Sequence, residues 1–134
     1  MRGTIDHLDL TVNDLAVSAP FYEALLSFLG YQRVRDEPSG IDWDFLSPNE
    51  SCSIGIKPAR AARVHDRYSC GLHHLAWRAE SRDDVDRLYN LLLTIRATIL
   101  DRPAEYPHYE AGYYAVFFAD PDGLKLEFVY LPRG

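Results

Sequence analysis

The chain begins with an alternation of apolar and polar residues. Within Thr4–Val12 the apolar residues recur at every second position from Leu8 onward, which predicts a strand that buries one face. The residues of the apolar face are Leu8, Leu10 and Val12. The residues of the opposite face are His7, Asp9 and Thr11.

A helical spacing of apolar residues comes next, with Phe21, Leu25, Phe28 and Leu29 at its apolar positions. We expect Ser18 to cap this helix, with Pro20 in the first turn and Gly30 just past the end. Three strand-like runs then follow at 31–36, 41–46 and 51–57, separated by turn-forming residues.

The second half of the chain repeats this order. A shift of 67 residues places His7 on His74, Leu8 on Leu75 and Tyr22 on Tyr89. Ser81 is the expected cap of a second helix, and strands are predicted at 72–79, 98–102, 113–119 and 124–131. The sequence therefore predicts an α+β fold made of two βαβββ modules, 1–60 and 70–134, within one domain that spans 1–134.

The composition fits one globular domain with no nucleic-acid or membrane partner. The chain has 134 residues and a net charge of −6, with acidic and basic residues interleaved, whereas binding to nucleic acid needs clustered Lys and Arg. Its apolar runs are shorter than the ~20 residues of a membrane helix, and its start shows no signal-peptide core. We therefore expect a cytoplasmic protein.

The same alternation indicates where chemistry can occur. His7, His74 and Glu127 are all predicted on the sheet face that is turned away from the helices, and a curved sheet would enclose that face as a pocket. Two imidazoles and one carboxylate can hold a divalent transition ion and leave positions open for substrate. The alternative is that these histidines are hydrogen-bonded structural residues.

Four segments resemble the vicinal oxygen chelate superfamily, which includes glyoxalases, bleomycin resistance proteins and extradiol dioxygenases. The segments are IDHLDLTVNDL, PFYEALLSFLG, GLHHLAWRAES and YYAVFFADPDGLKLEFVY. The resemblance implies that the two modules form a curved mixed sheet around a central pocket, as in glyoxalases. It also implies a divalent metal ion (Mn, Fe, Ni, Co or Zn) bound by His7, His74 and Glu127, with Glu127 as the catalytic residue.

The chain departs from the glyoxalase I pattern at one ligand position, and one histidine next to a proposed ligand is not expected to bind the metal. Glyoxalase I has a second carboxylate on the last strand of its first module, where this chain has Ile54. A three-ligand site is therefore expected. His73 has the wrong parity for a ligand and is expected to be structural or at the surface.

Three functions agree with this resemblance. The first is a metal-dependent lyase, isomerase or thiol transferase whose small substrate chelates the ion through neighbouring oxygens. The alternatives are an extradiol Fe(II) dioxygenase and a non-catalytic binding protein of the bleomycin resistance type. Candidate substrate-binding residues are Arg78, Tyr109 and Tyr113. The short length is typical of family members that form homodimers.

Overall fold

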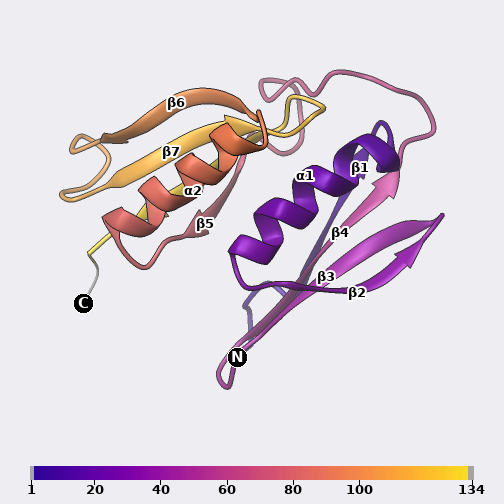
Figure 1. Cartoon of the computed structure of the whole chain (residues 1–134), viewed down its shortest axis with the longest axis horizontal. Coiled ribbons are helices and arrows are strands. Elements are labelled where there is room, and N and C mark those ends of the chain that lie inside the picture. Colours follow the sequence, from indigo (N-terminus) through magenta and orange to yellow (C-terminus); the bar gives the residue numbers. More distant parts are fainter. Residues whose placement is uncertain (1, 133–134) are drawn as a thin grey trace. The chain divides into compact units, whose positions relative to one another are not determined.

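A computed structural model of the chain describes residues 2–132. The chain divides into two compact units, Met1–Arg63 and Val64–Gly134, here called unit 1 and unit 2. Each unit has the order strand, helix, strand, strand, strand (Figure 1). The predicted α+β architecture of two βαβββ modules is confirmed.

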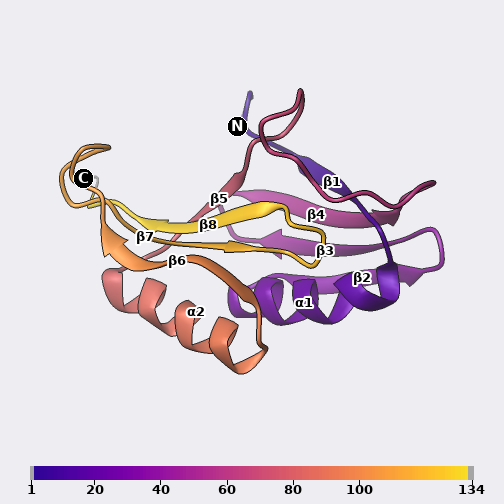
Figure 2. The same ribbon diagram turned by 90° about the horizontal axis from the view of Figure 1, so that it is seen from above.

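Unit 1 is a four-stranded sheet with one helix on one face (Figure 2). Its elements are β1 (His7–Val12), α1 (Leu15–Phe28), β2 (Gln32–Glu37), β3 (Gly40–Leu46) and β4 (Ser51–Pro58). The strand order is β1-β4-β3-β2, and β1 runs parallel to β4 while the other pairs are antiparallel. As the alternation predicts, Leu10 and Val12 are buried and His7 and Asp9 are exposed.

Unit 2 repeats this topology. Its elements are β5 (Leu75–Arg78), α2 (Arg82–Thr94), β6 (Thr98–Glu105), β7 (Tyr114–Ala119) and β8 (Lys125–Tyr130). The order is β5-β8-β7-β6, with β5 parallel to β8. Figure 2 shows α2 on one face of this sheet. Leu126 and Phe128 of β8 are buried, and because side chains alternate along a strand, Glu127 between them points to the face opposite theirs.

Helix α1 begins earlier than the sequence pattern predicts. Its N-cap is Asp14, whose carboxylate accepts a hydrogen bond from the backbone N–H of Ala16 at 2.9 Å, so the expected cap at Ser18 is wrong. Ser18 lies inside the helix and is fully buried, and Pro20 also lies inside it rather than in the first turn. The helix tolerates Pro20 at the loss of one backbone hydrogen bond to Ala16. In α2 the expected cap is confirmed, since Ser81 accepts from Asp84 at 3.0 Å.

Both helices end in the same hydrogen-bonded turn. After α1, Tyr31 N–H donates to the Leu26 carbonyl at 2.8 Å, and Gly30 takes the left-handed conformation at φ 96°. After α2, Ala97 N–H donates to the Leu92 carbonyl at 2.9 Å, but the left-handed residue is Arg96 at φ 59°. A glycine adopts this conformation without the steric cost that a side chain brings.

Opposite substitutions at these two turns should have opposite effects. Gly30→Ala should lower the free energy of unfolding by about 1 kcal/mol, and Arg96→Gly should raise it by about 0.5–1 kcal/mol, because only the left-handed residue changes its steric cost. Urea denaturation followed by far-UV circular dichroism measures both. The explanation fails if Arg96→Gly destabilises the protein as much as Gly30→Ala does.

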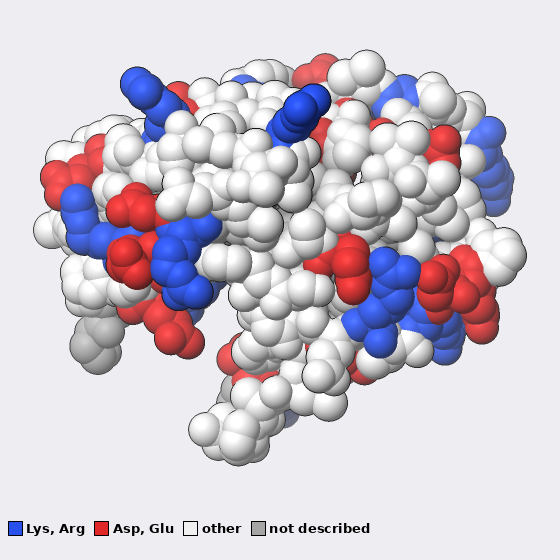
Figure 3. All heavy atoms as spheres, viewed as in Figure 1, with Lys and Arg blue, Asp and Glu red and all other residues white. Residues whose placement is uncertain are grey.

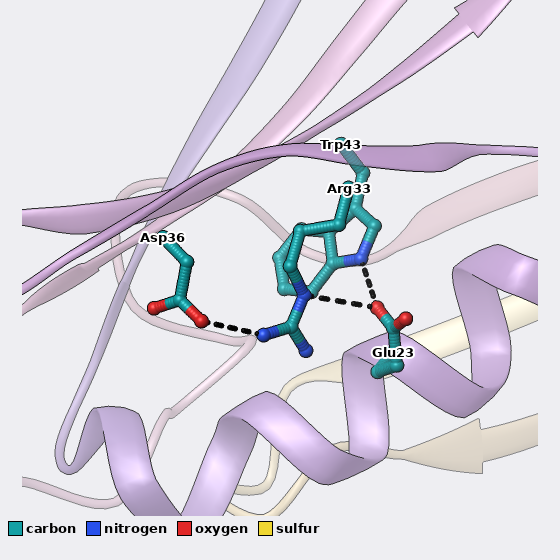
Figure 4. Close-up of polar contacts among 4 residues, drawn as sticks. All are labelled: Glu23, Arg33, Asp36 and Trp43. Atoms are coloured by element: carbon teal, nitrogen blue, oxygen red, sulfur yellow. Dashed lines mark hydrogen bonds and ion pairs between the residues drawn. The ribbon is translucent and has the colours of Figure 1, made fainter.

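A buried tryptophan ties the sheet of unit 1 to its helix (Figure 4). Trp43 of β3 is fully buried, and its indole N–H donates to Glu23 Oε2 of α1 at 2.5 Å. Arg33 of β2 donates to the same oxygen at 3.3 Å, lies 5.4 Å from the centre of the Trp43 ring and pairs with Asp36 at 2.7 Å. One carboxylate of α1 thus connects two neighbouring strands.

The charged residues are mixed in sign on the molecular face that Figure 3 displays. Lys and Arg there alternate with Asp and Glu and leave no extended patch of one sign. Within residues 2–132 no helix is long and apolar enough to cross a membrane.

Candidate functional site

A buried carboxylate is the centre of the candidate site in unit 2. Glu127 lies on β8, next to Ala76 of β5 and Phe117 of β7, and its exposed fraction is 2%. A carboxylate at this depth needs partners, because burying an unpaired charge is costly. One partner is the His74 ring, whose Nε2 lies 3.1 Å from Glu127 Oε1.

Tyr113 provides the second partner of this carboxylate. Its hydroxyl donates to Glu127 Oε2, the oxygen that His74 does not contact. Tyr113 comes directly before β7, at the end of the 106–113 loop, and this loop closes through a hydrogen bond from Tyr106 N–H to the Tyr113 carbonyl at 2.9 Å. Both oxygens of Glu127 are therefore held in fixed directions.

His73 contacts the nitrogen of the His74 ring that does not face Glu127. Its Nδ1 lies 2.7 Å from Nδ1 of His74, and the edge of the Tyr68 ring packs against it with 5.6 Å between ring centres. His73 is exposed, as expected, but alternation along a strand does not separate it from His74. Strand β5 begins only at Leu75, so both histidines precede the region where side chains alternate. Partial loss of hydration lowers the pKa of His73, and charges on His74 and Lys125 lower it further.

The other predicted metal ligand, His7, belongs to unit 1. It is the first residue of β1 and its Nδ1 lies 2.8 Å from Asp6 Oδ1. The hydrogen bond to Asp6, and then the charge of that carboxylate, raise the pKa of His7 above its ordinary value, with a smaller contribution from Asp9. His7 thus lies on the exposed face of its own sheet.

The pKa of His7 should respond to Asp6 in particular. Asp6→Asn should bring it down toward the ordinary value of 6.5, because the negative charge is lost and the neutral amide oxygen is a weaker acceptor than a carboxylate. Asp9→Asn should lower it by less. NMR titration of the ring carbons in metal-free protein measures both pKa values, and equal effects of the two variants would contradict this ranking.

The candidate substrate-binding residues occupy different positions. Tyr113 contacts Glu127, whereas Tyr109 stacks on Tyr106 with 5.4 Å between ring centres and is 59% exposed. Arg78 is exposed at the end of β5, two residues after Ala76, the strand partner of Glu127. Arg78 and Glu127 thus belong to the same sheet face.

An aromatic cluster lies between the exposed loop and the sheet. Tyr106 contacts Tyr109, Tyr113 and Phe117, with ring centres 5.4, 6.1 and 5.4 Å away. Burial raises the pKa of Tyr106, and nearby Asp101 raises it further. The cluster keeps the loop folded onto the sheet beside Glu127, and only Tyr109 offers a large exposed ring.

The separation of the donor atoms of His74 and Glu127 can be compared with the geometry of a metal ion. Two donor atoms that each lie about 2.1 Å from one ion, at angles between tetrahedral and octahedral values, are separated by about 3.0–3.4 Å. The observed separation is 3.1 Å. The donor types and spacing of these two residues are compatible with a transition metal as well as with the direct hydrogen bond that joins them. No group of three His, Cys, Asp or Glu side chains in residues 2–132 forms a metal-binding cluster.

Unit 1 has two surface cavities. One, of about 410 Å³, lies between the start of the chain and the β3–β4 turn, and its lining includes Thr4, Asp6 and Asn49. The other, of about 390 Å³, lies between α1 and β2. Neither includes a residue that the sequence predicts for the site.

Comparison with known proteins gives a consistent family relationship. Residues 4–128 match the model of the Glyoxalase/Bleomycin resistance protein/Dioxygenase superfamily. The chain is 33% identical over 126 residues to the uncharacterized protein YqjT of Bacillus subtilis, covering 92% of this chain and 95% of that protein. It is 27% identical to the metallothiol transferase FosB of Lysinibacillus sphaericus, covering 93% and 80%.

Solved structures agree with this relationship. A glyoxalase candidate from Bacillus halodurans superimposes with a TM-score of 0.81 at 27% identity, covering 97% of both chains. A lactoylglutathione lyase from Agrobacterium tumefaciens has a TM-score of 0.66 at 16% identity, covering 96% and 93%, which shows likeness of fold only.

Proposed function

Because the chain belongs to the Glyoxalase/Bleomycin resistance protein/Dioxygenase superfamily, we propose that it is a metal-dependent lyase, isomerase or thiol transferase. Its substrate is a small molecule that binds the ion through two neighbouring oxygens. The observation that carries this proposal is the 3.1 Å separation of His74 Nε2 and Glu127 Oε1, on a carboxylate that is otherwise buried.

The proposed ligands are His74 and Glu127 of unit 2 and His7 of unit 1. When bound, a divalent ion would polarise a substrate oxygen and stabilise the negative charge that develops on it. The donor types fit Mn²⁺, Fe²⁺, Ni²⁺, Co²⁺ and Zn²⁺. Neutral imidazoles supply no charge to the ion, so the Glu127 carboxylate is the anionic ligand of the set.

Other residues have proposed roles in binding and orientation. Tyr113 holds the second oxygen of Glu127 and thereby fixes the direction of the first. Tyr109 presents an exposed ring for contact with an apolar part of the substrate. Arg78, on the same sheet face as Glu127, offers a positive charge to an anionic group of the substrate.

Thiol transfer is the reaction that the name of one relative supports. FosB, a metallothiol transferase, is 27% identical over most of this chain. A non-catalytic binding protein is the second candidate. The exposed ring of Tyr109 and the net charge of −6 favour it, because a net negative charge and an exposed aromatic face suit a planar cationic ligand.

Metal uptake distinguishes these two functions. Purified protein is treated with chelator, incubated separately with each candidate metal, and analysed for bound metal after gel filtration. The enzyme proposal expects one ion per chain and turnover in a screen of thiols, 2-oxoaldehydes and similar small substrates. Absence of metal uptake together with tight binding of a planar ligand would support the binding protein instead.

His74→Ala is the variant that tests the site within this experiment. It should lose the bound ion, because the imidazole Nε2 is a proposed ligand. His108→Ala is the matched control: it removes a histidine of the same unit, whose ring lies 4.3 Å from that of Tyr109, and it should retain the ion. Unchanged stoichiometry in His74→Ala would remove His74 from the site.

The two units are proposed to act together as a single glyoxalase-like domain, since the ligand set draws on both. A homodimer is the proposed assembly, and size-exclusion chromatography with light scattering tests it. A monomer at micromolar concentration would contradict the assembly and leave the ligand set unaffected.

A further inference from the structure

We propose that His73 is a positioning residue that holds the ring of His74 with its Nε2 directed at Glu127. This inference rests on the proposed function, in which His74 Nε2 is a metal ligand. The observation that carries it is the 2.7 Å separation between Nδ1 of His73 and Nδ1 of His74.

The hydrogen bond from His73 acts on the side of the ring opposite the ligand atom. An imidazole has two nitrogens, and when one of them binds a metal the other carries a proton and donates it. In the metal-free protein, Nε2 of His74 donates to the Glu127 carboxylate, which can only accept. Once Nε2 binds the metal, the proton of the neutral ring is on Nδ1. Nδ1 of His73 is the acceptor within reach of that proton.

This acceptor is important because His74 precedes the first hydrogen-bonded residue of β5. Ladder hydrogen bonds fix backbone direction within a strand, but His74 lies outside the strand and its side chain is partly exposed. Without a partner at Nδ1, the ring can rotate about its side-chain bonds and take Nε2 away from Glu127. Strand hydrogen bonds therefore do not fix the orientation of His74, and the side-chain contact with His73 fixes it instead.

The ring of His73 is itself held in place. The edge of Tyr68 packs against it, and the guanidinium group of Arg67 lies 4.9 Å from the centre of the Tyr68 ring. Asp66 accepts hydrogen bonds from the backbone N–H of Tyr68 at 3.0 Å and from the Ser69 hydroxyl at 2.8 Å, which orders this turn. The segment before β5 therefore holds His73 in place beside the proposed ligand His74.

Two substitutions of His73 separate positioning from simple loss of a side chain. His73→Leu removes the acceptor, whereas His73→Asn places an amide oxygen close to the position of Nδ1. Affinity for Zn²⁺ and Co²⁺ is measured by competition with a chelator. We expect His73→Leu to weaken both metals about 10- to 100-fold, the usual effect of losing a partner of a metal ligand. His73→Asn should recover most of this loss, and His108→Leu should cause none.

NMR of the ring nitrogens gives a readout that does not need the metal. In metal-free protein the His74 nitrogen signals should shift in His73→Leu and stay closer to wild type in His73→Asn. Far-UV circular dichroism checks that each variant is folded. The proposal is overturned if His73→Leu changes neither affinity nor the His74 signals, or if His73→Asn is as weak as His73→Leu.

Failure of the proposed function gives a different result. In that case the wild-type protein binds neither metal, while the His74 signals still respond to His73→Leu. That outcome overturns the metal site and retains His73 as the residue that orients His74. If the wild-type protein binds the metal but the His73 variants change neither the metal affinity nor the His74 signals, the metal site stands and the positioning role is overturned.

Discussion

Replacing Glu127 by glutamine should lower metal affinity by more than about 100-fold, the upper end of what loss of a residue supporting a metal ligand costs. The carboxylate is the proposed anionic ligand, and an amide oxygen is a much weaker donor to a transition ion. Glutamine has nearly the same size and can still accept a hydrogen bond from Tyr113. The variant should therefore fold, and chelator competition with Zn²⁺ or Co²⁺ measures the affinity.

Glu80→Gln is the matched control, because Glu80 belongs to the same unit but is exposed after the end of β5. It should bind metal as the wild-type protein does. If Glu127→Gln retains full affinity while folded, the carboxylate is not a ligand. The burial of Glu127 would then require a structural explanation through His74 and Tyr113 alone.

Trp43→Ala should cost unit 1 about 3–5 kcal/mol of unfolding free energy, as is usual when a large aromatic side chain is removed from a core. Trp43 is fully buried, so its removal leaves a cavity between the sheet and α1. It also leaves Glu23 without the indole N–H that donates to it (Figure 4). Domains of this size are stable by about 5–15 kcal/mol, so the loss is a large fraction of the total.

Far-UV circular dichroism in urea measures this loss, since it does not rely on the fluorescence of the tryptophan that is removed. Trp43→Phe keeps most of the packing and should cost less than Trp43→Ala, because it loses mainly the hydrogen bond to Glu23. Val34→Ala, at an exposed position of β2, should change stability by no more than about 0.5 kcal/mol. An unchanged urea midpoint for Trp43→Ala would contradict the packing role.

The strands and helices could be predicted because their signals are local. The alternation at Leu10 and Val12 places β1 with one buried face, and the capping function of Ser81 needs only its near neighbours. The same local reasoning was wrong at Ser18. There Asp14 caps α1 instead, and the apolar neighbours of Ser18 bury it inside the helix. A Ser before an apolar run can be either the N-cap of a helix or a buried residue inside it, and its burial decides which of the two it is.

The sequence by itself determined the repeated order of elements and the face of each strand that bears His7 and Glu127, because side-chain periodicity is a property of neighbouring residues. Only the tertiary structure decided which side chains meet. The parallel pairing of β5 with β8 brings His74 to Glu127 across 53 residues, and the folded loop brings Tyr113 to the same carboxylate. His73 was likewise found only in the structure, since strand parity has no meaning before the first ladder hydrogen bond.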